Sequence, residues 1–189
     1  MDRQSWKVKG KEMKIVLLEG SPHKNGASNT LARAFAKGAQ KNGHTVTELD
    51  IAHMRINPCM GCASGWGDQP CVLKGDMEGV RKEILQSDML VFVTPIYFYG
   101  LSGQMKILID RFHCFSSQLK AKRMKSALIT SAWRTDSEVM HYVEEYYLGL
   151  SRYLGFRDCG MILGYGCGTA EIARTSRYAQ EAFRLGKSL

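Results

Sequence analysis

The chain has 189 residues, of which 44% are hydrophobic and 23% are charged, and these values are ordinary for a folded globular domain. They exclude a largely disordered chain. The formal net charge of +8 is compatible with nucleic acid, a membrane surface or small anions, and by itself it selects none of them. The densest basic group lacks interleaved aromatic residues, which favours a solvated connection over a nucleic-acid surface: Lys120, Lys122, Arg123 and Lys125.

The apolar content of the chain, the composition of its N-terminal residues and the number of cysteines indicate the compartment and the domain organisation. No apolar stretch approaches the roughly 20 residues that span a bilayer, and the first dozen residues lack the apolar centre of a secretion signal. Residues 1–12 are polar and basic, so we expect a tail or leader there and a single domain over residues 13–189. Six cysteines without an export signal indicate reduced thiols or a metal site. We therefore expect a cytoplasmic protein with neither a membrane nor a nucleic acid as partner.

The first predicted strand is followed by a candidate phosphate-binding loop. The apolar run from Ile15 to Leu18 is continuous, which is typical of a parallel strand buried on both faces. The segment from Gly20 to Thr30 is rich in turn formers and hydroxyl groups, and Ser28, Asn29 and Thr30 are expected to cap the helix that follows. Unpaired N–H groups and the helix dipole attract phosphate to such a helix start. The alternative to a phosphate-binding loop is an ordinary strand–helix connection that is rich in turn-forming residues.

The rest of the chain alternates between helical and strand patterns. The cysteine-bearing stretch over 50–75 is longer than an ordinary connection, which indicates a functional or disordered segment. Five strands that alternate with helices predict a three-layer α/β fold with a parallel sheet, in which ligands bind in the loops after the strands, here 20–30, 94–100 and 131–136. The predicted elements after the first loop are a helix over 31–43, a strand over 45–49, a helix over 76–86, a strand over 89–93, a helix over 102–112, a strand over 127–130, a helix over 137–153, a strand over 161–163 and a helix over 172–185.

Four ordered motifs resemble one known family. They are the Gly20–Thr30 loop, Pro-Cys-Met-Gly-Cys at 58–62, the segment from Cys71 to Met77, and Thr-Pro-Ile-Tyr-Phe-Tyr-Gly at 94–100. Together they resemble the NADPH-dependent FMN reductase and iron–sulfur flavoprotein family of the flavodoxin-like superfamily, closely from Lys14 to Arg111. The resemblance implies a doubly wound five-stranded sheet of order 2-1-3-4-5, bound FMN, and NADPH or NADH as electron donor.

The resemblance also implies which residues hold the flavin. The phosphate is expected among Ser21, His23, Asn25, Ser28, Asn29 and Thr30, with Lys24 adding positive charge. The isoalloxazine ring is expected against Pro95, Ile96, Tyr97, Phe98 and Gly100, although core packing at a strand end explains such aromatics as well. Ser131 and Trp133 are expected to complete the site, but the family often has glycines there, and Trp133 also suits an oligomer contact.

The cysteines depart from the iron–sulfur pattern of that family. Cys59 and Cys62 match its first two cluster ligands, but Gly65 stands at the third position, so that with Cys71 only three thiolates remain. Because a cubane cluster normally needs four, we expect no [4Fe–4S] cluster. Zinc held by these three thiolates with His53, or a redox-active Cys59–Cys62 pair, are alternatives to ordinary reduced thiols, which we favour. The other three cysteines are expected to be buried as small apolar side chains: Cys114, Cys159 and Cys167.

The function implied by the resemblance is an FMN-dependent NAD(P)H oxidoreductase. A small-molecule acceptor such as a quinone, a flavin, a nitroaromatic or a metal complex would receive the electrons, and no catalytic side chain is expected because the flavin carries the chemistry. An electron-transfer flavoprotein without direct nicotinamide use and a non-enzymatic FMN or phosphate-binding module are the alternatives. A homodimer or higher homo-oligomer is implied too, and a stripe of apolar residues offers surface for it, although core packing also explains that stripe: Met140, Tyr142, Tyr146, Tyr147 and Leu150.

Overall fold

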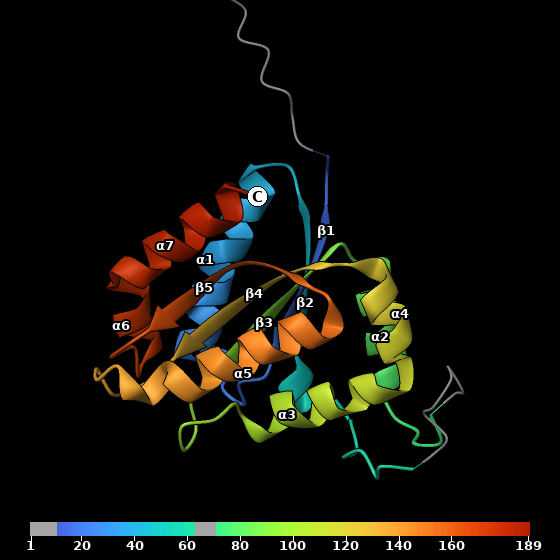
Figure 1. Ribbon diagram of the computed structural model, residues 1–189. Helices are drawn as coiled ribbons and strands as arrows, with labels where there is room; N and C mark the ends of the chain where they lie inside the picture. The colour runs from blue at the N-terminus through green and yellow to red at the C-terminus, as the bar shows by residue number, and fades with distance from the viewer. Residues whose placement is uncertain (1–10, 63–70) are drawn as a thin grey trace, which may run out of the picture.

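The computed structural model describes residues 11–62 and 71–189, so most of the tail predicted at residues 1–12 lies outside it. In the described residues one parallel sheet runs through the molecule (Figure 1). Its strands are β1 (Lys14–Glu19), β2 (Thr45–Leu49), β3 (Met89–Pro95), β4 (Lys125–Ser131) and β5 (Arg157–Gly164). Their order is β2-β1-β3-β4-β5 with every neighbouring pair parallel, which confirms the predicted flavodoxin-like topology.

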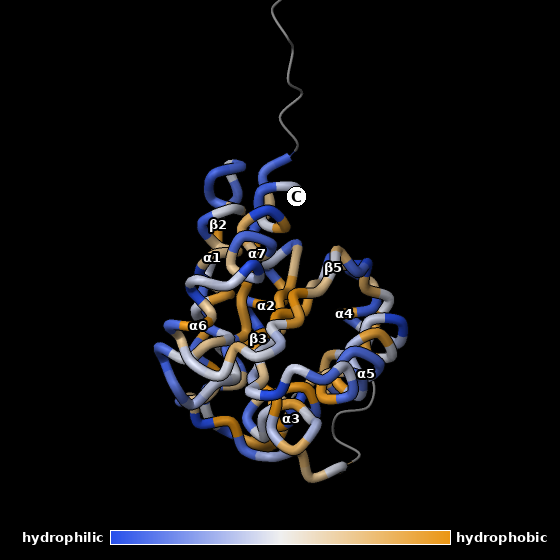
Figure 2. Tube along the Cα trace, turned by 90° about the vertical axis from the view of Figure 1, so that its left-hand side faces the viewer, coloured by the Kyte–Doolittle hydropathy of each residue, from blue (hydrophilic) through white to orange (hydrophobic). Residues whose placement is uncertain are grey.

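Helices cover both faces of the sheet, as Figures 1 and 2 show from two directions. One face carries α1 (Ala27–Lys41), α6 (Ala170–Thr175) and α7 (Arg177–Lys187). The other carries α2 (Met77–Gln86), α3 (Gly103–Asp110), α4 (Ser116–Lys122) and α5 (Glu138–Leu154), together with the short 3₁₀ helices η1 (Ile51–His53) and η3 (Arg111–Phe115). No helix in the described part of the chain is long and apolar enough to cross a membrane.

The continuous apolar run in β1 reflects burial on both faces of the sheet. Ile15 and Leu17 pack under α1 and α7, whereas Val16 and Leu18 pack on the opposite side, under the α2, α3 and α5 layer. Successive side chains of a strand point to opposite faces, so a strand between two helical layers needs apolar residues at every position. The prediction of a central buried strand is confirmed.

Two glycines let α1 and α7 pack backbone against backbone. A Cβ atom on Gly38 of α1 would lie 2.1 Å from the Phe183 carbonyl oxygen, and one on Gly186 of α7 would lie 2.2 Å from the Phe35 carbonyl oxygen. Neither position has room for any side chain. This contact seats α7 directly over α1 (Figure 1).

The structure corrects several predicted boundaries. The helix predicted over 102–112 ends as an α-helix at Asp110 and continues through η3 into α4, a helix that the sequence analysis missed. Lys120 and Lys122 therefore lie on α4 and Lys125 begins β4, so most of the basic group is not a connection. The single helix predicted over 172–185 is two helices, because the backbone is extended at Ser176, between α6 and α7.

Candidate functional site

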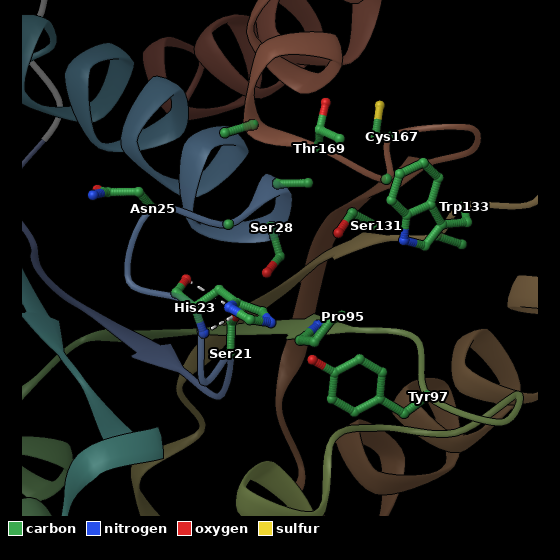
Figure 3. A pocket seen from close by; sticks show the side chains of 15 residues that line it. Ser21, His23, Asn25, Ser28, Pro95, Tyr97, Ser131, Trp133, Cys167 and Thr169 are labelled. Carbon is green, nitrogen blue, oxygen red and sulfur yellow. Dashed lines mark hydrogen bonds between the residues drawn. The ribbon is translucent and has the colours of Figure 1, made fainter.

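The predicted loops meet around one cavity at the carboxyl ends of the strands. Its volume is about 390 Å³, and it lies beside the start of α1 (Figure 3). Loops after β1, β3 and β4 line it, as expected, and a fourth segment between β5 and α6 completes it. The lining residues are Ser21, His23, Asn25, Gly26, Ala27, Ser28, Pro95, Tyr97, Ser131, Ala132, Trp133, Cys167, Gly168, Thr169 and Ala170.

The loop after β1 folds tightly and presents the first turn of α1 to the cavity. The Ser21 hydroxyl accepts a hydrogen bond from the His23 N–H at 3.2 Å, and the Gly26 N–H donates to the His23 carbonyl at 2.8 Å. A Cβ atom on Gly26 would lie 3.0 Å from that carbonyl and 3.1 Å from the Ser21 hydroxyl, so glycine keeps this turn narrow. The loop therefore holds the helix start close to Ser21.

The prediction that Ser28, Asn29 and Thr30 cap α1 is wrong. The helix begins one turn earlier, with Gly26 at the N-cap and no side chain bonded to the first N–H groups. Thr30 instead donates its hydroxyl to the Gly26 carbonyl at 2.9 Å. Because the first N–H groups of a helix have no intrahelical partner, α1 presents unpaired donors beside the cavity.

Ser28 adds a buried donor to this helix start. Its side chain is 1% exposed, and its hydroxyl has no hydrogen-bond partner among the described residues. In Figure 3 this hydroxyl points into the space that His23 and Ser131 also border. No acidic residue lies in the first turn of α1. A buried unpaired hydroxyl at a helix N-terminus without acidic neighbours favours an anionic ligand.

The loop after β3 forms a two-residue turn that projects aromatic side chains. Tyr97 and Gly100 exchange two backbone hydrogen bonds, of 3.0 Å and 2.9 Å. Phe98 and Tyr99 at the tip have φ angles of 48° and 63°, in the left-handed region that non-glycine residues rarely adopt. Tyr97 faces the cavity, while Phe98 is fully exposed. The turn thus places one aromatic ring in the cavity wall and another in solvent.

Trp133 forms a second wall of the cavity by packing on a glycine. A Cβ atom on Gly168 would lie 2.1 Å from the indole ring, so only glycine permits this contact. The rest of the Trp133 ring is open, and the residue is 72% exposed. Beside it, Arg134 forms an ion pair with Asp136 at 2.6 Å. The loop after β4 and the segment before α6 therefore meet through the indole ring.

Six of the fourteen predicted flavin contacts do not line this cavity. Lys24 forms an ion pair with Asp50 at 3.7 Å, and Thr30 bonds the loop backbone. Asn29 is buried behind the loop, where its amide donates to Glu19 at 3.3 Å and to the Lys24 carbonyl at 3.4 Å. The other three lie in the loop after β3: Ile96, Phe98 and Gly100. The eight that line it are Ser21, His23, Asn25, Ser28, Pro95, Tyr97, Ser131 and Trp133.

The segment between β5 and α6 was not predicted as part of the site. Gly168, Thr169 and Ala170 line the cavity, and the Thr169 hydroxyl accepts a hydrogen bond from the Ile172 N–H at 3.2 Å as the N-cap of α6. Cys167 also lines the cavity and is buried, as predicted. The signal was present, since this segment also follows the carboxyl end of a parallel strand.

Glu19 ends β1 and is buried beneath the loop. Burial, with a further contribution from the neighbouring carboxylate of Glu48, raises its pKa to about 7 against an opposing effect of Arg33. One carboxyl oxygen accepts the Asn29 amide, and the other has no hydrogen-bond partner among the described residues. The charge of this side chain therefore changes near neutral pH.

The described residues bring together no group of three or more His, Cys, Asp or Glu side chains that could share a metal ion. Zinc held by Cys59, Cys62 and Cys71 with His53 is thus not supported, and the His53 ring instead bonds Asp50 at 2.8 Å. Gly65, which marks the broken cluster spacing, lies outside the described residues. Contrary to prediction, two further cysteines are only partly buried: Cys114 and Cys159.

Comparison with known proteins places these features in a family. The chain is 27% identical over 162 residues to an iron–sulfur flavoprotein of Archaeoglobus fulgidus, covering 85% of this chain and 72% of the relative. It is 25% identical over 185 residues to a putative NAD(P)H-dependent FMN-containing oxidoreductase of Bacillus subtilis, covering 93% and 97%. With an iron–sulfur flavoprotein of Methanocaldococcus jannaschii, 29% identical, the match spans about half of each chain, 52% of this one and 51% of the relative.

Solved structures and a family model agree with this likeness. An NAD(P)H:quinone oxidoreductase from Methanothermobacter marburgensis superposes with a TM-score of 0.77 at 17% identity, covering 94% of this chain and 96% of that chain, which shows a shared fold. The model of NADPH-dependent FMN reductases matches residues 13–183. The resemblance of the four motifs is therefore confirmed: the chain belongs to the NADPH-dependent FMN reductase family and is an FMN-binding, NAD(P)H-dependent oxidoreductase.

Proposed function

We propose that this chain passes electrons from NADPH or NADH to a small-molecule acceptor, with FMN held in the cavity at the start of α1. Bound FMN would supply the hydride acceptor and the electron carrier of this reaction, so no side chain would be required as a nucleophile. A quinone, a free flavin, a nitroaromatic or a metal complex suits an open site over a flavin ring. The protein contributes binding, orientation and shielding from water.

The buried hydroxyl of Ser28 is the observation that carries this proposal. A phosphate dianion needs several short donors, and this cavity offers the Ser28 hydroxyl, which has no other partner among the described residues, together with the first N–H groups of α1. Leaving such a hydroxyl unpaired costs roughly 1–3 kcal/mol, which a bound anion would recover. The donor set therefore fits the phosphate of FMN.

The other walls of the cavity suit the rest of the cofactor. Pro95 and Tyr97 would lie along one side of the flavin and Trp133 along another, while the Ser131 hydroxyl would face its polar part. Asn29 and Thr30 would support the phosphate-binding loop without touching the cofactor, since their side chains donate hydrogen bonds to the Lys24 and Gly26 carbonyls. Lys24 would contribute charge without direct contact, because its ammonium group pairs with Asp50.

Anaerobic mixing of the FMN-loaded protein with NADPH, and separately with NADH, tests the first half of the reaction. We expect rapid loss of the visible absorbance of the bound flavin with at least one of the two donors. A second mixing step with a quinone, a nitroaromatic, free flavin or a ferric chelate then identifies the acceptor class by the recovery of that absorbance. Rapid recovery with one of these acceptors supports the proposed function.

The same experiment separates the alternatives. Slow bleaching by both nicotinamides, with fast exchange of single electrons with a redox protein, would instead assign the chain as an electron carrier. A protein that takes up no FMN after refolding or soaking would leave only a non-enzymatic module and would overturn the proposal. Iron analysis of the purified protein tests the expectation that no [4Fe–4S] cluster is bound.

We also propose that a second copy of this chain covers the mouth of the cavity. Large aromatic side chains stand exposed around it or near it on the loops after β3 and β4 and on α5: Tyr97, Phe98, Trp133 and Tyr142. Exposed aromatic groups of this kind are enriched at protein interfaces. Light scattering of the wild-type protein and of Phe98→Asp tests this, and a monomeric wild-type protein would contradict it.

A further inference from the structure

A second pocket of about 300 Å³ lies away from the cofactor cavity and shares no lining residue with it. It is formed by the segment over 71–75, the first turns of α2, and η3. Two cysteines and four charged residues line it: Cys71, Cys114, Lys74, Glu78, Arg81 and Arg111. Nothing in the reaction proposed above uses these groups.

Arg111 brings a buried positive charge to the wall of this pocket. It is 2% exposed, and its guanidinium donates to the Asn57 carbonyl at 2.9 Å, to the Leu73 carbonyl at 3.3 Å and to the Cys71 sulfur at 3.3 Å. Among the residues that the structure describes, it has no carboxylate partner. A buried guanidinium requires a compensating negative charge, and the sulfur is the one of these three acceptors that can carry it. Arg111 therefore favours the thiolate form of Cys71.

The two cysteines differ in their readiness to ionise. Burial opposes ionisation of Cys71, but the backbone hydrogen bond at Leu73 and the guanidinium of Arg111 outweigh it and lower the pKa of the thiol. Burial raises the pKa of Cys114, and the neighbouring sulfur of Cys71 raises it further. Both sulfurs line the pocket and both bond Arg111: the Cys114 thiol donates to the Arg111 carbonyl at 3.2 Å, and the Arg111 guanidinium donates to the Cys71 sulfur at 3.3 Å. The pair thus combines a sulfur that favours the thiolate form with a thiol that stays protonated, at the same arginine.

We propose that Cys71 and Cys114 form a peroxide-sensitive thiol pair, with Cys71 the sulfur that reacts and Cys114 the sulfur that resolves. The Cys71 thiolate attacks one oxygen of hydrogen peroxide, the O–O bond breaks, and sulfenic acid forms while hydroxide leaves and takes up a proton as water. The Cys114 sulfur then attacks the sulfenic sulfur, its proton leaves with the hydroxyl group as a second water, and a disulfide forms. Two thiols thereby supply the two electrons that reduce one peroxide, and a dithiol reductant reverses the change.

The arrangement meets the requirements of such a site. Reactive cysteines lie in electropositive, partly exposed surroundings, and redox-sensing ones stand next to a resolving thiol. Cys71 and Cys114 are both partly exposed at the pocket, beside Arg111 and Arg81. By contrast, Cys159 lies outside this pocket, and burial raises its pKa. Cys159 therefore serves as the matched control.

Non-reducing mass spectrometry of the full chain after brief treatment with hydrogen peroxide tests the proposal. We expect a cross-linked peptide pair containing Cys71 and Cys114 that dithiothreitol removes. Cys114→Ser should instead accumulate sulfenic acid on Cys71, which dimedone traps, and Cys71→Ser should give neither product. Cys159→Ser should behave as wild type. Oxidation that begins at Cys59 or Cys62, or that leaves Cys71 reduced, would overturn the proposal without touching the flavin reaction.

The role of Arg111 has a separate readout. At neutral pH we expect iodoacetamide to alkylate Cys71 roughly fivefold faster than Cys159, because thiolate content rises more than nucleophilicity falls. Arg111→Lys keeps a positive charge but loses the guanidinium fork, so the rate at Cys71 should fall towards that of Cys159. Equal rates at the two cysteines in the wild-type protein would refute the assignment even if the variant fails to fold.

Discussion

Replacing Ser28 by alanine should separate cofactor affinity from folding stability. The hydroxyl is buried and has no hydrogen-bond partner among the described residues, so its loss removes no hydrogen bond between those residues from the FMN-free protein. Alanine also has the higher helix propensity in the first turn of α1. We therefore expect the free energy of unfolding of the FMN-free protein to stay the same or rise.

The affinity for FMN should fall in the same variant. A hydrogen bond to a charged group contributes about 1.5–3 kcal/mol, which corresponds to a dissociation constant that rises about 10- to 150-fold. Binding should persist, because the N–H groups at the start of α1 remain. Fluorescence titration of FMN into the flavin-free protein measures this change, and thermal unfolding of the same preparation measures stability.

Ser87 provides the matched control for this prediction. It is equally buried, but its hydroxyl donates to the Ile84 carbonyl at 2.9 Å, and it does not line the cofactor cavity. Ser87→Ala should therefore lower stability by about 1 kcal/mol and leave FMN affinity unchanged. The reasoning is refuted if the two variants lose stability equally and both bind FMN within twofold of wild type.

Two further predictions concern stability. The pKa of Glu19 is raised to about 7 in the folded chain, above its ordinary value of 4.5, so the folded chain holds this proton more tightly than the unfolded chain. The resulting contribution to the free energy of unfolding is complete below about pH 4.5 and is lost as the pH rises through about 7. Glu19→Gln should flatten this part of the curve of melting temperature against pH, and a slope identical to wild type would contradict the raised pKa. Gly38→Ala should cost roughly 1–3 kcal/mol, because the methyl group meets the Phe183 carbonyl, whereas Gly149→Ala on an open side of α5 should gain about 0.5–1 kcal/mol in denaturant unfolding. Equal effects at both glycines would show that the close packing of α1 and α7 is misjudged.

The sheet could be predicted from the sequence because its signals are repeated along the chain. The side chains of β1 and β3 are buried on both faces of the sheet, so each apolar residue of the run indicates the same buried strand. By contrast α4 has seven residues, too few for a helical period to stand out, and it follows α3 through η3 without a break. The boundary between α6 and α7 depends on the extended backbone at Ser176. No glycine or proline stands there to indicate in the sequence that the helix is interrupted.

The cavity was predictable by position but only partly by residue. The rule that ligands bind beyond the carboxyl ends of parallel strands located three of its loops, and the motif resemblance supplied residues up to Arg111. Gly168 and Ala170 carry no functional group, so their role follows only from packing against Trp133 and from the geometry of the chain. Asn29 turns away because Glu19, ten residues earlier, accepts its amide, and no spacing rule encodes that contact.

The turn at Phe98 and Tyr99 has a consequence for protein engineering. Non-glycine residues in left-handed conformations cost roughly 1–3 kcal/mol each, and within one copy of the chain the fully exposed Phe98 recovers none of that by burial. Asparagine tolerates the same conformation better, so Phe98→Asn offers a simple route to a single copy of the chain that unfolds at a higher temperature. If the aromatic side chains at the tip of this turn contribute to turnover, the more stable variant will be the slower enzyme. The turn is then a place where lower stability accompanies higher activity.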